Sequence, residues 1–186
     1  MGGRYVALIR GINVGRAKRV AMADLWDLVQ TLGYVDVSTL LNSGNILFTI
    51  PRGPDAGAAA GAAARIERAL LARLAIAARV VVLSAADVAA IVRENPLGAV
   101  ARDPSRLLVT VLTDPADRPG LMPLSRQRWS PEALALGSRA AYLWCPAGII
   151  KSPLLSAVNK VLGDRATSRN WTTMTKIHAL AEAPTR

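Results

Sequence analysis

Residues 10–19 form a glycine-containing loop that has a net charge of +4, contains no acidic residue and is well suited to binding an anion. Backbone N–H groups beside Gly11 and Gly15 can approach an oxyanion closely, because glycine has no side chain in the way. The spacing matches neither a dinucleotide-binding G-x-G-x-x-G motif nor a P-loop. The simpler alternative is a tight turn with a surface arginine. The predicted binding residues are Arg10, Gly11, Asn13 and Gly15.

A second basic segment spans residues 151–176 and also has a net charge of +4. The two segments together hold +8 of the chain's total of +10, whereas an evenly solvated surface would spread its charge. This concentration predicts an anionic partner. The simpler alternative is a coding bias, since 19 of the 23 basic residues are arginine. The candidate binding residues of this segment are Lys151, Ser152, Arg169, Asn170 and Lys176.

Two motifs in the second segment have a structural interpretation as well as a binding one. Ser152 precedes Pro153 and is a good N-cap for a helix, whose free N–H groups would also suit a phosphate. In Arg169-Asn170-Trp171 the guanidinium could clamp an anion while the indole stacks on a planar group. We expect Arg169 to bind a ligand and Trp171 to pack in the core.

The segment Asn42-Ser43-Gly44-Asn45 is a turn signal between two strand-like stretches. A hairpin turn alone explains Gly44. A binding role for the four residues depends on whether the turn lies next to Arg10 in the fold.

No catalytic constellation is recognisable in the sequence. His178 is the only histidine and Cys145 the only cysteine, so they build neither a zinc site nor a disulfide, and we predict no metal or cofactor. For an enzyme that acts on a phosphorylated substrate, Ser43 is the candidate nucleophile and Lys151 or Lys176 the candidate electrophile. Nothing in the sequence activates Ser43, so the residues leave catalysis open.

Hydrophobic periodicity places these residues on an order of elements that occurs twice. The first half has strands at 4–9, 35–41, 46–50 and 79–83, and helices at 22–32 and 62–77. The second half has strands at 106–113, 133–138, 140–145 and 166–170, and a helix between Ser152 and Gly163. The Pro-rich segment 114–128 supports at most a short, irregular helix, and a terminal helix spans 172–181.

The order βαββαβ is typical of the ferredoxin-like arrangement, an antiparallel four-stranded sheet with helices on one face. We therefore predict an α+β protein of two successive ferredoxin-like halves, with a connecting helix and a C-terminal helix. The predicted divisions are a first half at 1–84, a connecting helix and linker at 85–104, and a second half at 105–186. Ser84-Ala85-Ala86-Asp87 predicts the cap of the connecting helix.

This topology predicts where the loops gather. The first and third strands are central and antiparallel, so residues 11–15 should lie next to residues 42–45. In the second half the third and fourth strands end at the same edge, so residues 145–152 should lie near residues 169–171. We expect the two loop clusters to line one basic cleft.

Three motifs, taken in order, resemble the family known as domain of unknown function 1697. The motifs are Tyr5 to Gly15 (YVALIRGINVG), Asn42 to Ile46 (NSGNI) and Thr167 to Lys176 (TSRNWTTMTK). The resemblance covers the chain from Arg4 to about Leu180. After Gly15 the family usually continues with Gly, Lys, Asn and Lys and then Val-Pro-Met, whereas this chain keeps the positive charge without that Gly and Pro. The resemblance implies the fold but no activity.

The charge pattern favours binding of a phosphorylated small molecule or nucleotide in the basic cleft. The alternatives are RNA or DNA binding, an enzyme acting on a phosphorylated substrate, and a structural or interaction protein. RNA-recognition motifs stack bases on sheet aromatics, and the central strands here offer only Tyr5 and Phe48. The single cysteine and the lack of a signal peptide or spanning apolar run predict a cytoplasmic protein without a membrane span. The sequence leaves the oligomeric state open.

Overall fold

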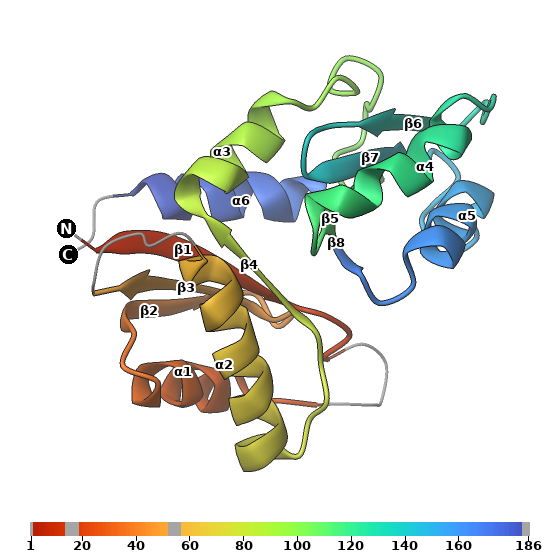
Figure 1. The fold of residues 1–186 in the computed structure, drawn as a ribbon. Coiled ribbons are helices and arrows are strands. Elements are labelled where there is room, and N and C mark those ends of the chain that lie inside the picture. Colours follow the sequence, from red (N-terminus) through yellow and green to blue (C-terminus); the bar gives the residue numbers. More distant parts are fainter. Residues whose placement is uncertain (1, 14–18, 52–56, 184–186) are drawn as a thin grey trace. The chain divides into compact units, whose positions relative to one another are not determined.

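The computed structural model describes residues 2–13, 19–51 and 57–183, and it contains two antiparallel four-stranded sheets with helices (Figure 1). The order of elements in each half is βαββαβ, so the predicted α+β fold is confirmed. The chain divides into two compact units, which are Met1–Val88 with Ile177–Arg186 and Ala89–Lys176.

The first unit holds the first sheet. Its strands are β1 (Gly3–Ile9), β2 (Val35–Leu40), β3 (Asn45–Ile50) and β4 (Val80–Ser84), and the helices of this half are α1 (Met22–Thr31) and α2 (Ala58–Leu74). The strand order is β2-β3-β1-β4, and β1 pairs antiparallel with both β3 and β4. β1 and β3 are therefore the central strands, as predicted.

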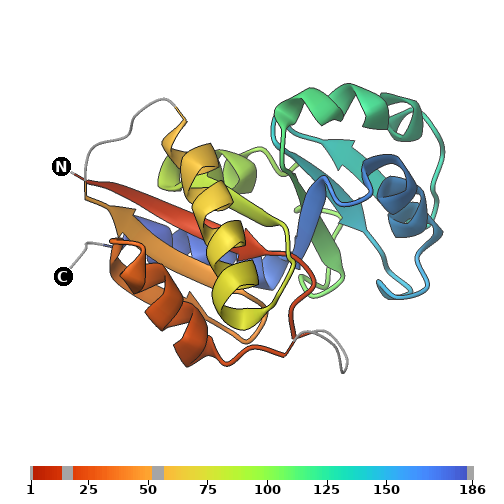
Figure 2. The same cartoon turned by 60° about the horizontal axis from the view of Figure 1, so that its bottom comes forward.

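One face of this sheet receives both helices. Tyr5, Ala7 and Ile9 share that face of β1, because successive strand residues point to opposite sides. They form one buried cluster with Phe48 of β3 and with apolar side chains of the two helices. The helical residues are Leu25, Leu28 and Val29 of α1 and Ala62, Ile66 and Leu70 of α2. Figure 2 shows α1 and α2 lying against the first sheet.

The second unit repeats this topology. Its strands are β5 (Leu107–Leu112), β6 (Ala133–Leu136), β7 (Ala140–Trp144) and β8 (Ala166–Asn170), and its helices are η1 (Pro115–Asp117), α4 (Arg118–Ser125) and α5 (Pro153–Leu162). The strand order is β6-β7-β5-β8. The Pro-rich segment forms only the 3-10 turn η1 and the short α4, which contains Pro123. The predicted short, irregular helix is therefore confirmed.

The remaining helices are α3 (Ala85–Arg93) and α6 (Trp171–Glu182). The predicted cap of α3 is present, because Ser84 Oγ accepts from the Asp87 N–H at 3.1 Å and Asp87 Oδ2 accepts from the Ser84 N–H at 2.9 Å. The boundary between the two units falls after Val88 in α3 and after Lys176 in α6. No helix in the described ranges has both the length and the apolar character that a membrane span needs.

Predicted and observed element ends differ by more than one residue in two elements. The helix predicted at 62–77 begins at Ala58, since the preceding alanines are strong helix formers, and it ends at Leu74. Ala75 has a φ of 53°, and this left-handed conformation stops the helix. The strand predicted at 133–138 ends at Leu136, because the next residues form the hairpin turn.

Candidate functional site

The loop that follows β1 lies against the turn between β2 and β3. The Ile9 N–H donates to Gly44 O at 2.9 Å, and Leu8 pairs with Asn45 across the two strands. Gly44 has a φ of 73°, and a Cβ there would lie 2.7 Å from the Ile12 side chain. The turn therefore needs glycine where it touches the loop. The predicted adjacency of these two segments is confirmed.

Asn13 fastens this loop with its side chain. Its Nδ2 donates to Asn42 O at 2.8 Å and to Val20 O at 3.0 Å, and its Oδ1 accepts from the Val20 N–H at 2.8 Å. Its φ of 55° lies in the left-handed region, which asparagine tolerates better than most residues. Both side-chain amide protons are used within the protein, so Asn13 positions the loop and does not offer them to a ligand.

A pocket of about 470 Å³ opens beside Asn13 at the beginning of α1. Its lining residues are Asn13, Arg19, Val20, Ala21, Met22 and Asn42. Ala21 occupies the N-cap position of α1 and makes no side-chain cap, although the first N–H groups of a helix need acceptors. Such N–H groups and the helix dipole attract anions. The exposed Arg19 adds positive charge, while Asp24 in the first helical turn opposes it.

Arg10 and Gly11, the other predicted residues of this loop that the structure describes, lie outside the pocket lining. Arg10 is half-buried, and its N–H donates to Arg79 O at 2.9 Å. Gly11 is exposed with a φ of 67°, which favours glycine. Gly15, Arg16 and Lys18 lie outside the described residues.

The turn residues after Asn42 stabilise the turn itself. Asn45 is fully buried, and its Nδ2 donates to Leu40 O and to Ser43 Oγ, both at 2.9 Å. Asn45 therefore holds the turn together. The Ser43 hydroxyl is an acceptor in this contact, which does not raise its nucleophilicity.

The second predicted cluster lies at one end of the second sheet. Leu107 of β5 pairs with Trp144 of β7, and Leu108 pairs with Asn170 of β8. The ends of β7 and β8 therefore flank the beginning of β5, as the topology predicted. This cluster and the pocket beside Asn13 belong to different units, and the common cleft expected from the sequence stays a prediction.

The beginning of α5 is occupied by the protein's own acceptors. Ser152 is the predicted N-cap, and its Oγ accepts from the Leu155 N–H at 2.9 Å. The Leu154 N–H donates to Glu132 Oε2 at 3.0 Å, and Pro153 has no N–H. A phosphate at this helix would have to displace a carboxylate, so only the exposed side chain of Lys151 stays available there.

Arg169 and Asn170 are engaged within the second unit. Arg169 is only 8% exposed, and burial lowers its pKa to about 10. Its Nη1 donates to Thr167 Oγ1 at 3.1 Å and to Ser168 O at 2.8 Å. Asn170 caps α6, since its Oδ1 accepts from the Thr173 N–H at 2.9 Å. Lys176, the last residue predicted here, is exposed.

The single cysteine and the single histidine form no reactive pair in the described structure. Cys145 is fully buried and its Sγ donates to Ser152 Oγ at 3.4 Å, while burial raises the pKa of the thiol. His178 lies 3.3 Å from Glu182 one helical turn later on α6. Among the described residues, no group of three His, Cys, Asp or Glu side chains could hold a metal ion.

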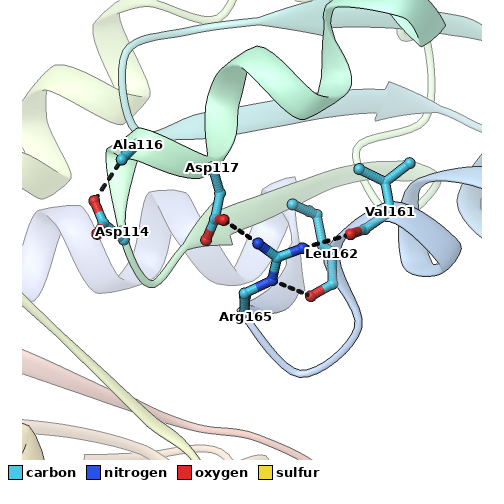
Figure 3. A network of polar contacts seen from close by, with 6 residues as sticks. All are labelled: Asp114, Ala116, Asp117, Val161, Leu162 and Arg165. Atoms are coloured by element: carbon cyan, nitrogen blue, oxygen red, sulfur yellow. Dashed lines mark hydrogen bonds and ion pairs between the residues drawn. The ribbon is translucent and has the colours of Figure 1, made fainter.

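In the second unit the connection from β5 to its first helix is held by side chains of the unit itself. Asp114 follows β5, and its Oδ1 accepts from the Ala116 N–H at 2.8 Å (Figure 3). Arg165 forms an ion pair with Asp117 and donates to Val161 O at 2.8 Å and to Leu162 O at 3.3 Å. The strand-to-helix connection is therefore capped and charge-paired within the unit.

Four residues that line the pocket, from Arg19 to Met22, were not named among the predicted binding residues. Arg19 contributes to the charge of the basic segment from which an anion site was predicted. One signal was available: Ala21 stands directly before the helix, where Ser, Thr, Asp or Asn is the usual cap. A helix start without a cap leaves donors for another acceptor.

Comparisons with known proteins agree with this fold. The family model described as "Protein of unknown function (DUF1697)" matches residues 3–142. A solved structure, that of conserved bacterial protein SP0830 from Streptococcus pneumoniae, is similar with a TM-score of 0.78 and 26% identity, and the match covers 98% of this chain and 100% of that chain. No curated protein matches. Neither description names a ligand or a reaction.

Proposed function

The chain belongs to the DUF1697 family, and we propose that it binds the phosphate group of a small molecule in the pocket at the beginning of α1. The observation that carries the proposal is the helix start at Ala21, which lacks a side-chain cap and opens into a pocket beside Arg19 and Asn42. An anion would accept from N–H groups that the helix itself cannot satisfy.

The side chains near the pocket have different roles in this proposal. Arg19 and Asn42 are exposed and line the pocket, so they touch the ligand. Asn13 and Gly44 hold the two loop segments together and act through position. Arg10 adds positive charge on the same loop, which strengthens long-range attraction of an anion. The proposal does not use the predicted residues of the second basic segment, because most hydrogen-bond donors in that segment are already bonded within the protein. These residues are Lys151, Ser152, Arg169, Asn170 and Lys176.

Binding of RNA in the manner of an RNA-recognition motif gains no support. Tyr5 and Phe48, the two central-strand aromatics, stack at a centroid distance of 6.1 Å on the face that α1 and α2 cover. They are 4% and 0% exposed, so they cannot stack on bases. The enzyme alternative gains no support from the bond between Asn45 and Ser43, in which the Ser43 hydroxyl is the acceptor. We keep the cytoplasm as the proposed location, which fits the single, unpaired cysteine.

The proposal is tested by isothermal titration of the protein with inorganic phosphate and ribose 5-phosphate at low ionic strength. We expect Arg19→Ala and Asn42→Ala to weaken binding at least fivefold, the arginine more, since bonds to a charged group contribute about 1.5–3 kcal/mol. Arg68→Ala is the matched control, because Arg68 is an exposed arginine on α2 of the same unit. Equal affinity in Arg19→Ala and Arg68→Ala, or no binding of either anion, would overturn the proposal.

A further inference from the structure

Residues 20–51 differ in charge from the rest of the chain. They contain three aspartates and no lysine or arginine, so their net charge is −3, whereas the whole chain has +10. Two of these aspartates, Asp27 of α1 and Asp36 of β2, are exposed. Arg4 is a cation at the border of this surface, since its Nη1 donates to Asp36 O at 3.2 Å. A negative surface on a strongly basic protein favours a basic partner.

Two exposed apolar side chains lie beside these aspartates. Trp26 precedes Asp27 and is 38% exposed, and Val35 precedes Asp36 and is 45% exposed. The helix and the strand are linked at this point, because Trp26 Nε1 donates to Val37 O at 2.8 Å. Trp26, Asp27, Val35 and Asp36 are called the acidic face below. It combines negative charge with apolar surface that the described part of the chain leaves exposed.

The opposite charge accompanies an exposed apolar residue in the loop between β7 and α5. Residues 133–163 contain three basic residues and no acidic one. Ile150 of this loop is 99% exposed, and the exposed Lys151 follows it. The Ser152 N–H donates to Ile149 O at 3.2 Å, and the Ile149 side chain packs against the buried cluster of the second unit. The loop is therefore fixed at its base, and its tip holds Ile150 away from the protein.

We infer that two copies of this chain associate, with the loop tip of one copy placed on the acidic face of the other. Ile150 packs on Trp26 and Val35, and Lys151 lies opposite the two aspartates. Because Ile150 is almost fully exposed, its own chain does not cover it. The contact joins two different surfaces, so it is heterologous and leaves one tip and one face free in a dimer. It does not depend on phosphate binding.

The local attraction can exceed the repulsion between two basic proteins. In about 0.15 M salt the screening length is about 8 Å, so the overall charges of two copies repel only weakly, while opposite charges in contact still attract. Burial of an isoleucine side chain changes an affinity roughly tenfold or more. A few side chains on each copy bury less area than a standard interface, so the association is weak and reversible.

The test is sedimentation equilibrium of the full chain in about 0.15 M salt at rising protein concentration. We expect the wild-type protein to self-associate. Ile150→Asp should weaken association at least tenfold, because it removes the apolar contact and sets a carboxylate against the aspartates. Asp27→Lys should weaken it at least fivefold. Leu71→Asp is the matched control and should associate as the wild type does, because Leu71 is a 59% exposed apolar residue on α2.

A mixture of the two weakened variants identifies the surfaces. Ile150→Asp keeps the acidic face and Asp27→Lys keeps the loop tip, so the mixture should form a one-to-one dimer at concentrations at which neither variant associates alone. Sedimentation velocity with a fluorophore on one variant measures this dimer. The inference is overturned by a wild-type protein that stays monomeric, by a mixture that forms no dimer, or by equal weakening in Leu71→Asp and Ile150→Asp.

Discussion

The loops after β1 and after β5 begin with the same pattern of backbone hydrogen bonds but differ in the side chains that follow. At the end of β1 the Ile9 N–H bonds Gly44 O and the Arg10 N–H bonds Arg79 O. At the end of β5 the Leu112 N–H bonds Arg139 O and the Thr113 N–H bonds Arg165 O, with all four distances at 2.9 Å. The two copies of the fold thus deliver the chain to the first helix in the same way.

Beyond that pattern the two units differ in the side chains at the starts of their helices. Asp114 caps the turn after β5, Asp117 pairs with Arg165, and Glu132 occupies the beginning of α5. In the first unit α1 begins after Ala21, which makes no cap, beside a pocket. The topology thus places the starts of helices at the ends of a sheet. A few acceptor side chains then determine whether the N–H groups of a helix start stay available to an external anion.

The largest expected effect is a difference in stability between variants of the two hairpin turns, which contain Gly44 and Gly137. Gly44→Ala should lower the free energy of unfolding by about 3 kcal/mol, because the new Cβ meets Ile12 at 2.7 Å in a left-handed conformation. Gly137→Ala should cost less, about 2 kcal/mol, because Gly137 has no left-handed conformation, although a Cβ there would lie 2.8 Å from Glu94 Oε2 and 3.1 Å from the Tyr142 ring. Urea unfolding of the two variants measures the difference. Equal losses would show that the first turn is no more constrained than the second.

The next largest effect on stability and anion binding is expected for substitutions of Asn13. Asn13→Ala removes two donated bonds and one accepted bond and leaves alanine in a left-handed conformation, so we expect a loss of about 2 kcal/mol and at least tenfold weaker anion binding. Asn13→Gly relieves the backbone strain and isolates the loss of the side chain. Unchanged anion affinity in both variants would contradict the positioning role.

Ala21→Asp converts the start of α1 into the kind found in the second unit. A capping carboxylate should stabilise the protein by about 1 kcal/mol and weaken phosphate binding at least tenfold, because it satisfies the donors and places negative charge in the pocket. Ala21→Ser supplies a cap without the charge and should weaken binding less. Thermal unfolding and phosphate titration are read together. A stabilised Ala21→Asp protein that binds phosphate as before would break the comparison.

The smallest effect concerns acid sensitivity. Glu94 Oε2 accepts from the Ser138 N–H at 2.7 Å and from its hydroxyl at 2.8 Å, and these bonds hold the pKa of Glu94 below its usual value. Because the folded-state pKa is depressed, its contribution is present above the unfolded pKa, about 4.3, and is lost as the pH falls through the folded value.

Glu94→Gln keeps an acceptor but no charge. We expect it to lower the free energy of unfolding by about 0.5 kcal/mol at pH 7, a small value because the site is exposed. The difference from the wild-type protein should shrink below pH 4.3, approximately, in urea unfolding. A difference that stays constant down to pH 2.5 would exclude the carboxylate as the cause. The Asn13 contacts, which involve no titrating group, should show no such pH dependence.

Much of this molecule could be predicted from local patterns. The apolar runs around Tyr5 and Phe48, the Ser152 cap and the Ser84–Asp87 cap all involve residues within a few positions of one another. The adjacency of Gly44 with the loop after β1 also followed, since the element order implies antiparallel central strands. Arg169 shows the limit: its charge suggested a surface, yet the side chain is buried.

The sequence by itself determined the twofold βαββαβ order, the basic segments and the helix start at Ala21, because periodicity, charge and capping are properties of neighbouring residues. Only the tertiary structure decided which donors are occupied. Glu132 reaches Leu154 across 22 positions and Asn13 reaches Asn42 across 29, and such contacts depend on the packed fold. Whether a polar group has a hydrogen-bond partner depends on its three-dimensional surroundings. Because the donors in the second unit are already bonded, the pocket beside α1 is the candidate site.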